Sequence, residues 1–167
     1  MYEERVGAKV PKAKSPEQAL ASLMRQCARA EKCSFDALRS MRRWGLSDED
    51  ARGVLARLHR ERFIDDGRYA AAFVREKARL SGWGARKIAA ALRAKSISGE
   101  AIEEALAQLS AAESGEKLEQ ILGKKAAKTK AASAYELKVK LIRFGVSRGF
   151  DLEDVVRTAE RLCRQSD

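Results

Sequence analysis

Residues 38–58 read LRSMRRWGLSDEDARGVLARL, a pattern typical of two amphipathic helices joined by a tight turn. Leu38 and Met41 lie at helical spacing before the turn, and an apolar stripe with the same spacing follows it. We expect Gly45 to end the first helix in a left-handed conformation, which glycine adopts without steric cost. Ser47, with three acidic residues directly after it, is a favourable start for the second helix.

The same cassette occurs twice more along the chain. The second copy lies at 88–109 and the third at 141–162. Their turn residues, Gly45, Ser96 and Gly149, are 51 and 53 positions apart. A repeat of this length is typical of one supersecondary unit stacked on copies of itself, and it argues against a pocketed enzyme.

The sequence therefore predicts an all-α fold of three tandem three-helix repeats, stacked into an elongated, curved array. The composition supports this prediction, since the chain has 167 residues, two prolines and many strong helix formers. Helix starts are expected at Ser15, Ser34, Ser47 and Ser98. The predicted divisions are a flexible basic tail at 1–14 and repeats at 15–62, 63–110 and 111–167.

Several classes of protein lack support in the sequence. No apolar stretch approaches the roughly 20 residues that cross a bilayer, and residues 1–14 lack the apolar segment of a secretory signal, so we expect a cytoplasmic protein without membrane contact. Three cysteines and one histidine have no metal-binding spacing. Asp65-Asp66 is interpreted as a helix cap. Because no catalytic motif is recognisable, we predict no enzyme activity, no metal and no cofactor.

The charge distribution indicates an acidic partner. The formal net charge is +10, and basic residues gather in two blocks. Residues 68–95 hold eight basic side chains and one acid, and residues 124–148 hold eight more beside Glu136. Between the blocks, residues 97–122 carry six glutamates and a single lysine. This alternation predicts basic surface on particular helices and a polyanion or a large acidic surface as partner.

Arginines at helical spacing are the first candidates for such contacts. Arg68, Arg75 and Arg79 are separated by seven and four positions, and Arg86 and Arg93 by seven, so each set shares one side of a helix. The full candidate set is Arg68, Arg75, Arg79, Arg86, Lys87, Arg93, Lys95, Lys138, Lys140, Arg143 and Arg148. The alternative is a solvated charged face, which any soluble helix needs.

Two tryptophans precede glycines at turns. Trp44 and Trp83 have aromatic faces on which a base or a partner side chain can stack. The interpretation that we favour is that each ring covers the end of a small core.

Three motifs resemble the RecX family of bacterial RecA regulators. They are Phe63-Ile64-Asp65-Asp66-Gly67-Arg68-Tyr69-Ala70, Gly84-Ala85-Arg86-Lys87-Ile88 leading into Leu92, Lys95 and Ile97, and Arg148-Gly149-Phe150. The resemblance spans roughly residues 34–162. Two departures occur: Ser96 stands where the family's middle repeat has a glycine, at a cost of about 1 kcal/mol, and residues 145–147 differ from the Leu and Arg common before Arg-Gly-Phe.

The resemblance implies a regulatory protein that binds the RecA filament on DNA. Such a protein inhibits filament extension, ATPase and strand exchange, and so modulates recombination, DNA repair and the SOS response. It also implies weak, sequence-nonspecific DNA binding, and we expect a monomer. The alternative is a RecA-independent helix-turn-helix protein that binds DNA through residues 38–58. The acids at 48–50 disfavour this alternative, because they would repel phosphate.

Overall fold

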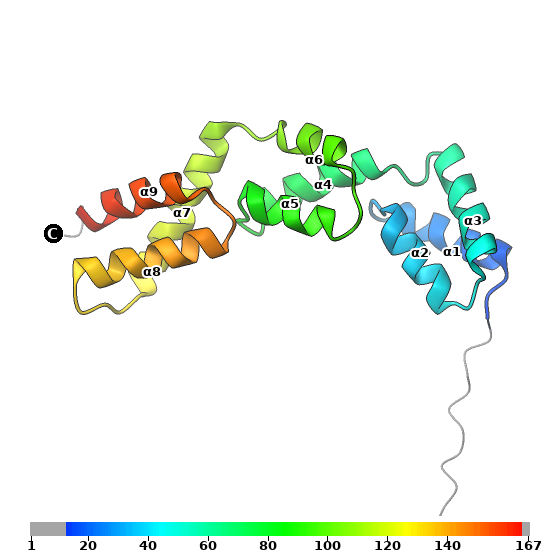
Figure 1. Cartoon of the computed structure of the whole chain (residues 1–167), viewed down its shortest axis with the longest axis horizontal. Coiled ribbons are helices and arrows are strands. Elements are labelled where there is room, and N and C mark those ends of the chain that lie inside the picture. The colour runs from blue at the N-terminus through cyan, green and yellow to red at the C-terminus, as the bar shows by residue number, and fades with distance from the viewer. Residues whose placement is uncertain (1–12, 165–167) are drawn as a thin grey trace, which may run out of the picture. The chain divides into compact units, whose positions relative to one another are not determined.

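The computed structural model describes residues 13–164, so most of the predicted tail at 1–14 lies outside the described residues. Within that range the chain forms nine α-helices and no strand (Figure 1). The helices are α1 Pro16–Cys27, α2 Ser34–Arg43, α3 Asp48–Arg60, α4 Asp66–Arg79, α5 Ala85–Arg93, α6 Gly99–Leu106, α7 Ala111–Lys128, α8 Ala134–Ser147 and α9 Leu152–Arg164. The all-α prediction is confirmed, whereas the elongated, curved arrangement stays a prediction.

Serine caps begin most of the helices that have a described cap. Ser15, Ser47 and Ser98 each accept a hydrogen bond from the backbone N–H three residues on, as predicted. The prediction for Ser34 is wrong, because α2 takes Cys33 as its N-cap and Ser34 is already its first helical residue. The side chain of Cys33 makes no capping bond to the helix backbone.

The three turn residues have the left-handed backbone that the cassette predicts. Their φ angles are +84° at Gly45, +57° at Ser96 and +91° at Gly149. Ser96 therefore adopts this conformation without the freedom of glycine, and its side chain is exposed. In each case the turn lets the next helix start within a few residues.

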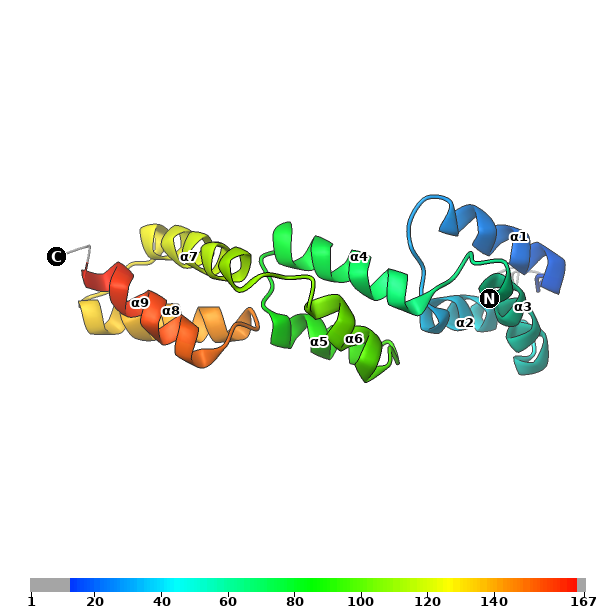
Figure 2. The ribbon, with the colours of Figure 1, turned by 90° about the horizontal axis from the view of Figure 1, so that it is seen from above.

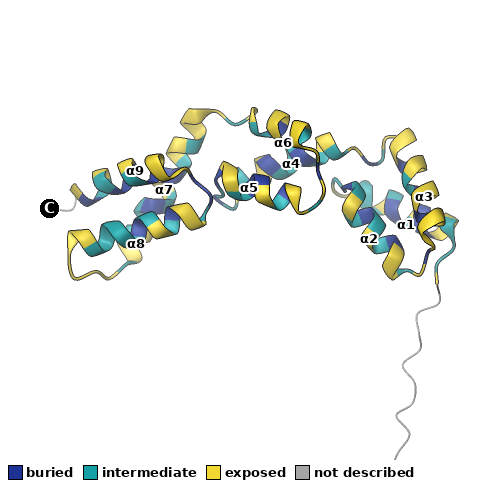
Figure 3. Cartoon of the chain, viewed as in Figure 1, coloured by how far each residue is buried: buried dark blue, intermediate teal, exposed yellow. Residues whose placement is uncertain are grey.

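The chain divides into two compact units, residues 1–65 and 66–167, called unit 1 and unit 2 here. In unit 1, α3 packs on both α1 and α2. The core between these helices is apolar, and its fully buried side chains include Leu23, Met41, Leu58 and Ile64. The stripes that the sequence places at helical spacing face this core, while the charged faces remain exposed (Figure 3).

Unit 2 contains α4–α6 and α7–α9. In the first of these triplets α4 lies along α6, and in the second α8 lies along α9 (Figure 2). The second triplet has its own core, in which Leu122, Leu141 and Val155 are fully buried. Because α4 also contacts α7, the two triplets meet within one compact unit.

Candidate functional site

Two backbone segments of unit 2 lie against each other where its triplets meet. One is 81–87, which comprises the turn after α4 and the first three residues of α5, and the other is 148–151 between α8 and α9. The backbone N–H of Gly84 donates to the carbonyl of Arg148 at 2.8 Å, and that of Arg86 donates to the carbonyl of Gly149 at 3.1 Å. We call these two segments the junction.

Two glycines make this close approach possible. A β-carbon on Gly84 would lie 2.4 Å from the backbone of Gly149 and Phe150. A β-carbon on Gly149 would lie 2.3 Å from the β-carbon of Lys87, and Gly149 also has a positive φ. No side chain fits at either position without moving backbone, so both positions require glycine.

Two of the predicted binding arginines hold the junction together. Arg148 donates to the carbonyl of Gly82 at 3.3 Å and also to the carbonyl of Ser81. Arg86 pairs with Asp151 at 2.5 Å, and both side chains are partly exposed to solvent. The guanidinium group of Arg148 is therefore used in hydrogen bonds within unit 2, and that of Arg86 is paired with a carboxylate of the same unit. Sequence reasoning missed these contacts, although Arg148 directly precedes Gly149 and Arg86 lies two positions after Gly84 in the resemblance motifs.

An aromatic cluster covers the same end of the first triplet. The rings of Phe73 and Trp83 meet edge to face, with centroids 6.4 Å apart. The ammonium groups of Lys87 and Lys77 lie 4.6 and 5.5 Å from the centroid of Trp83. Trp83 thus packs within unit 2.

In unit 1, Trp44 is likewise packed against the core, and the ammonium of Lys14 lies 3.7 Å from its ring centroid. Trp44 therefore has the packing role that the sequence analysis favoured, whereas Trp83 contacts the ring of Phe73 and lines a cavity.

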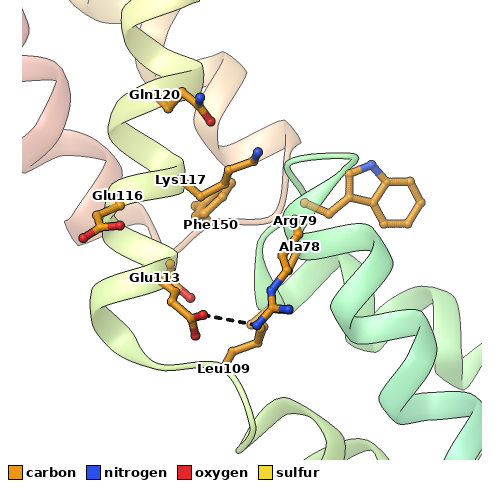
Figure 4. A pocket seen from close by; sticks show the side chains of 11 residues that line it. Ala78, Arg79, Leu109, Glu113, Glu116, Lys117, Gln120 and Phe150 are labelled. Carbon is orange, nitrogen blue, oxygen red and sulfur yellow. Dashed lines mark hydrogen bonds and ion pairs between the residues drawn. The ribbon is translucent and has the colours of Figure 1, made fainter.

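A cavity of about 420 Å³ lies beside the junction, between the end of α4 and α7 (Figure 4). Its apolar wall includes Trp83, Leu109 and Phe150. At its rim, Arg79 points toward Glu113 and pairs with it at 3.3 Å. Hydrogen bonds from the backbone and side chain of Ser110, with a smaller contribution from Arg79, lower the pKa of Glu113.

The other predicted site residues differ in how far they are engaged. Lys138 pairs with Glu160 at 2.7 Å, and Lys140 pairs with Glu136 at 2.6 Å. These lysines lower the pKa of both glutamates, chiefly through their hydrogen bonds. The ammonium of Lys95 lies 5.9 Å from the ring of Tyr69.

Three predicted arginines are exposed and have no ion-pair partner in the described part of the chain. They are Arg75 on α4, Arg93 on α5 and Arg143 on α8. Arg68 is also exposed, on the first turn of α4. All four side chains are therefore accessible on the surface of unit 2.

The helix-turn-helix of unit 1 presents acids where a DNA reader needs neutral or basic side chains. Asp48, Glu49 and Asp50 form the first turn of α3, and all three are exposed. A recognition helix inserts its N-terminal residues into the major groove, where they contact base edges. The three carboxylates would then lie between the two phosphate backbones and would be repelled by them. Docking of this helix in a major groove is disfavoured.

Between residues 13 and 164, no helix is both long and apolar enough to cross a membrane. The same residues hold no cluster of three or more His, Cys, Asp or Glu side chains that would suit a metal ion.

These features define an all-α protein made of three-helix groups, with a glycine-mediated junction and exposed arginines. Residues 65–106 match the family model for the second three-helix domain of RecX. Residues 65–106 are thus similar to a RecX three-helix domain, and the resemblance seen in the sequence motifs is confirmed.

One curated relative and two solved structures extend this comparison. The chain is 28% identical over 107 residues to the regulatory protein RecX of Oceanobacillus iheyensis, an alignment that covers 64% of the chain but 39% of that relative. The crystal structure of RecX from Lactobacillus salivarius matches with a TM-score of 0.76 and 18% identity, over 88% of this chain and 96% of that one. A crystal structure of a regulatory protein RecX matches with a TM-score of 0.79 and 20% identity, over 87% of this chain and 73% of that one. These two structures support the fold.

Proposed function

We propose that this protein binds the RecA filament on DNA and inhibits its extension, its ATPase and strand exchange. The observation that carries the proposal is the match of residues 65–106 to the second three-helix domain of RecX, a segment with the exposed cations Arg75 and Arg93 on adjoining helices. On this proposal the protein is a regulator without a catalytic role, it acts in the cytoplasm as a monomer, and it contacts DNA weakly and without sequence preference.

The physical basis is the combination of free guanidinium groups with a rigid support. Arg75 and Arg93 have no ion-pair partner among residues 13–164, so binding an acidic partner does not first require a bond within the protein to break. Planar guanidinium groups form paired hydrogen bonds with carboxylates and phosphates. Several modest contacts spread over unit 2 then add through avidity along a polymer of identical subunits.

The direct test is DNA-stimulated ATP hydrolysis by the cognate RecA with this protein added. We expect hydrolysis to fall with increasing protein, and electron microscopy to show shorter filaments. Unchanged hydrolysis together with unchanged filament length at several-fold excess would contradict the proposal.

A charge-reversal variant tests the arginines themselves. Arg75→Glu with Arg93→Glu is expected to weaken inhibition at least tenfold, which corresponds to about 1.4 kcal/mol of binding free energy. The matched control is Arg52→Glu with Arg60→Glu, since both residues are exposed on α3 and have no ion-pair partner in the described chain. Circular dichroism should show the same helical signal for both. If the two variants inhibit equally, the arginines of unit 2 form only a solvated face.

A further inference from the structure

A second hollow lies in unit 2, between the end of α7 and the second half of α8. This cleft has a volume of about 510 Å³. Its lining consists of Lys125, Lys128, Thr129, Lys140, Arg143, Phe144 and Ser147. Four of these seven side chains are cationic and none is acidic. We call it the α7–α8 cleft; the loop 129–133 joins its two helices (Figure 1).

The positive charge of the cleft exceeds what the fold itself requires. Lys125 and Lys128 lie in the last turn of α7, where they offset the negative end of the helix, equivalent to about half an elementary charge. Lys140 pairs with Glu136 at 2.6 Å and also donates to the carbonyl of Lys130. Four cations against one carboxylate and one helix end leave an excess of about +2.5 charges.

The hydroxyl groups in the lining already have acceptors. Thr129 donates to the carbonyl of Lys125 at 2.6 Å, and Ser147 donates to the carbonyl of Phe144 at 2.7 Å. Arg143 has no partner among the described residues. The donors that remain for a ligand are therefore ammonium groups and one guanidinium, which select an anion.

The aromatic ring beside the cations favours a nucleic acid as the anionic ligand. Three of the four cations are lysines, which bind phosphates as point charges, and the single arginine can pair with one phosphate through two hydrogen bonds. Phe144 is half-buried in the wall, and the ammonium of Lys125 lies 5.2 Å from its ring centroid. A cationic track beside an aromatic ring is the combination that binds single-stranded nucleic acids without sequence preference.

We infer that the α7–α8 cleft binds the phosphodiester backbone of a single-stranded nucleic acid. The inference rests on the proposed function, because it states which part of a filament on DNA this cleft contacts. It also assigns roles to Lys125, Lys128 and Phe144, which lie outside the arginine stripes. The ligand is a continuous strand, since successive phosphates are needed to engage cations on both helices.

The test is a salt titration of binding to a labelled oligothymidylate in the absence of RecA. The variant is Lys128→Gln with Arg143→Gln, which removes one cation from each helix of the cleft. Each lost phosphate contact reduces the slope of log K against log salt by about 0.7, so the slope should become about 1.4 less steep. The same counterion release predicts binding on the order of 50-fold weaker near 50 mM salt.

Three controls separate the cleft from general charge and from folding. Arg52→Gln with Arg60→Gln removes the same charge from α3 and should leave the slope within about 0.3 of the wild-type value. Lys128→Arg with Arg143→Lys keeps the charge and should keep the slope. Phe144→Leu keeps an apolar wall and should weaken binding of the oligothymidylate without changing the slope, because stacking releases no counterion.

An unchanged slope in the Lys128→Gln, Arg143→Gln variant would overturn the inference. It would also be overturned if that variant lost binding to polyglutamate but kept binding to the oligothymidylate, because the cleft would then be a carboxylate site. Inhibition of RecA is measured separately. If the wild type inhibits RecA but the salt slope of the Lys128→Gln, Arg143→Gln variant is unchanged, only the inference about the cleft is refuted. If the slope of the variant changes but the wild type does not inhibit RecA, only the proposed function is refuted.

Discussion

Replacing Gly84 with alanine is expected to open the junction and to lower the free energy of unfolding of unit 2. The added β-carbon would lie 2.4 Å from the backbone atoms of Gly149 and Phe150. Ordinary contact needs about 1 Å more, and neither backbone can rotate away as a side chain can. The two segments must therefore separate.

The size of the effect follows from the bonds that separation breaks. The N–H groups of Gly84 and Arg86 would lose their acceptors at 2.8 and 3.1 Å, at about 1 kcal/mol each. Arg148 would lose its bonds to the turn 81–82, which contributes about 1 kcal/mol more because that side chain is half-buried. We expect a loss of about 3 kcal/mol in total.

Urea denaturation followed by circular dichroism measures this loss, and hydrogen exchange locates it. Protection should fall at the N–H groups of 84 and 86 before it falls in the core of α7–α9. The control is Gly123→Ala, because a β-carbon there meets no atom within 4 Å and α7 should gain about 0.5–1 kcal/mol. If Gly84→Ala costs less than about 1 kcal/mol, the junction does not join the triplets as described.

Two further predictions concern a turn and a helix cap. Ser96→Gly relieves the left-handed conformation and should raise the Tm by about 2–4 °C in a thermal melt. Ser98→Gly is its control, because it removes the side-chain cap of α6 two residues away and should lower the Tm slightly. An equal rise of the Tm in both variants would show that Ser96 is not strained. Glu113 has a lowered pKa in the folded chain, so its ionised form stabilises the protein at pH values above its ordinary pKa of 4.5. This contribution is lost as the pH falls through the pKa that Glu113 has in the folded state. Glu113→Gln should make the unfolding free energy less sensitive to acid, and a chemical-shift titration of Glu113 at or above 4.5 would contradict the expected direction.

Local structure was predictable from the sequence because local chemistry determines it. Serines before apolar stripes cap helices at 15, 47 and 98, and left-handed residues at 45, 96 and 149 mark the turns. Cys33 shows the limit of this reasoning. A serine one position later has the right chemistry for a cap, but Cys33 is fully buried, so the helix starts where packing requires.

The partners of the charged residues were much less predictable. Arg86 fits a helical stripe of cations and Arg148 belongs to the basic block at 124–148, yet their acceptors lie 65 to 67 positions away along the chain. Helical periodicity reports which residues share a face, and it contains no information on what the face meets. The α7–α8 cleft was missed for a related reason: the basic block at 124–148 was recognised, but the hollow and its aromatic wall depend on how two helices pack.

The backbone hydrogen bonds of the junction also have a consequence for binding. Because they tie residues 81–87 to 148–151, the cations of α4 and α5 keep fixed distances from those of α7 and α8. A ligand that spans both triplets then finds its contacts preorganised and loses less conformational entropy on binding. With the junction opened by Gly84→Ala, the same cations would belong to two tethered groups, each of which must be ordered separately. Affinity for a long partner would fall even though every contacting side chain is still present.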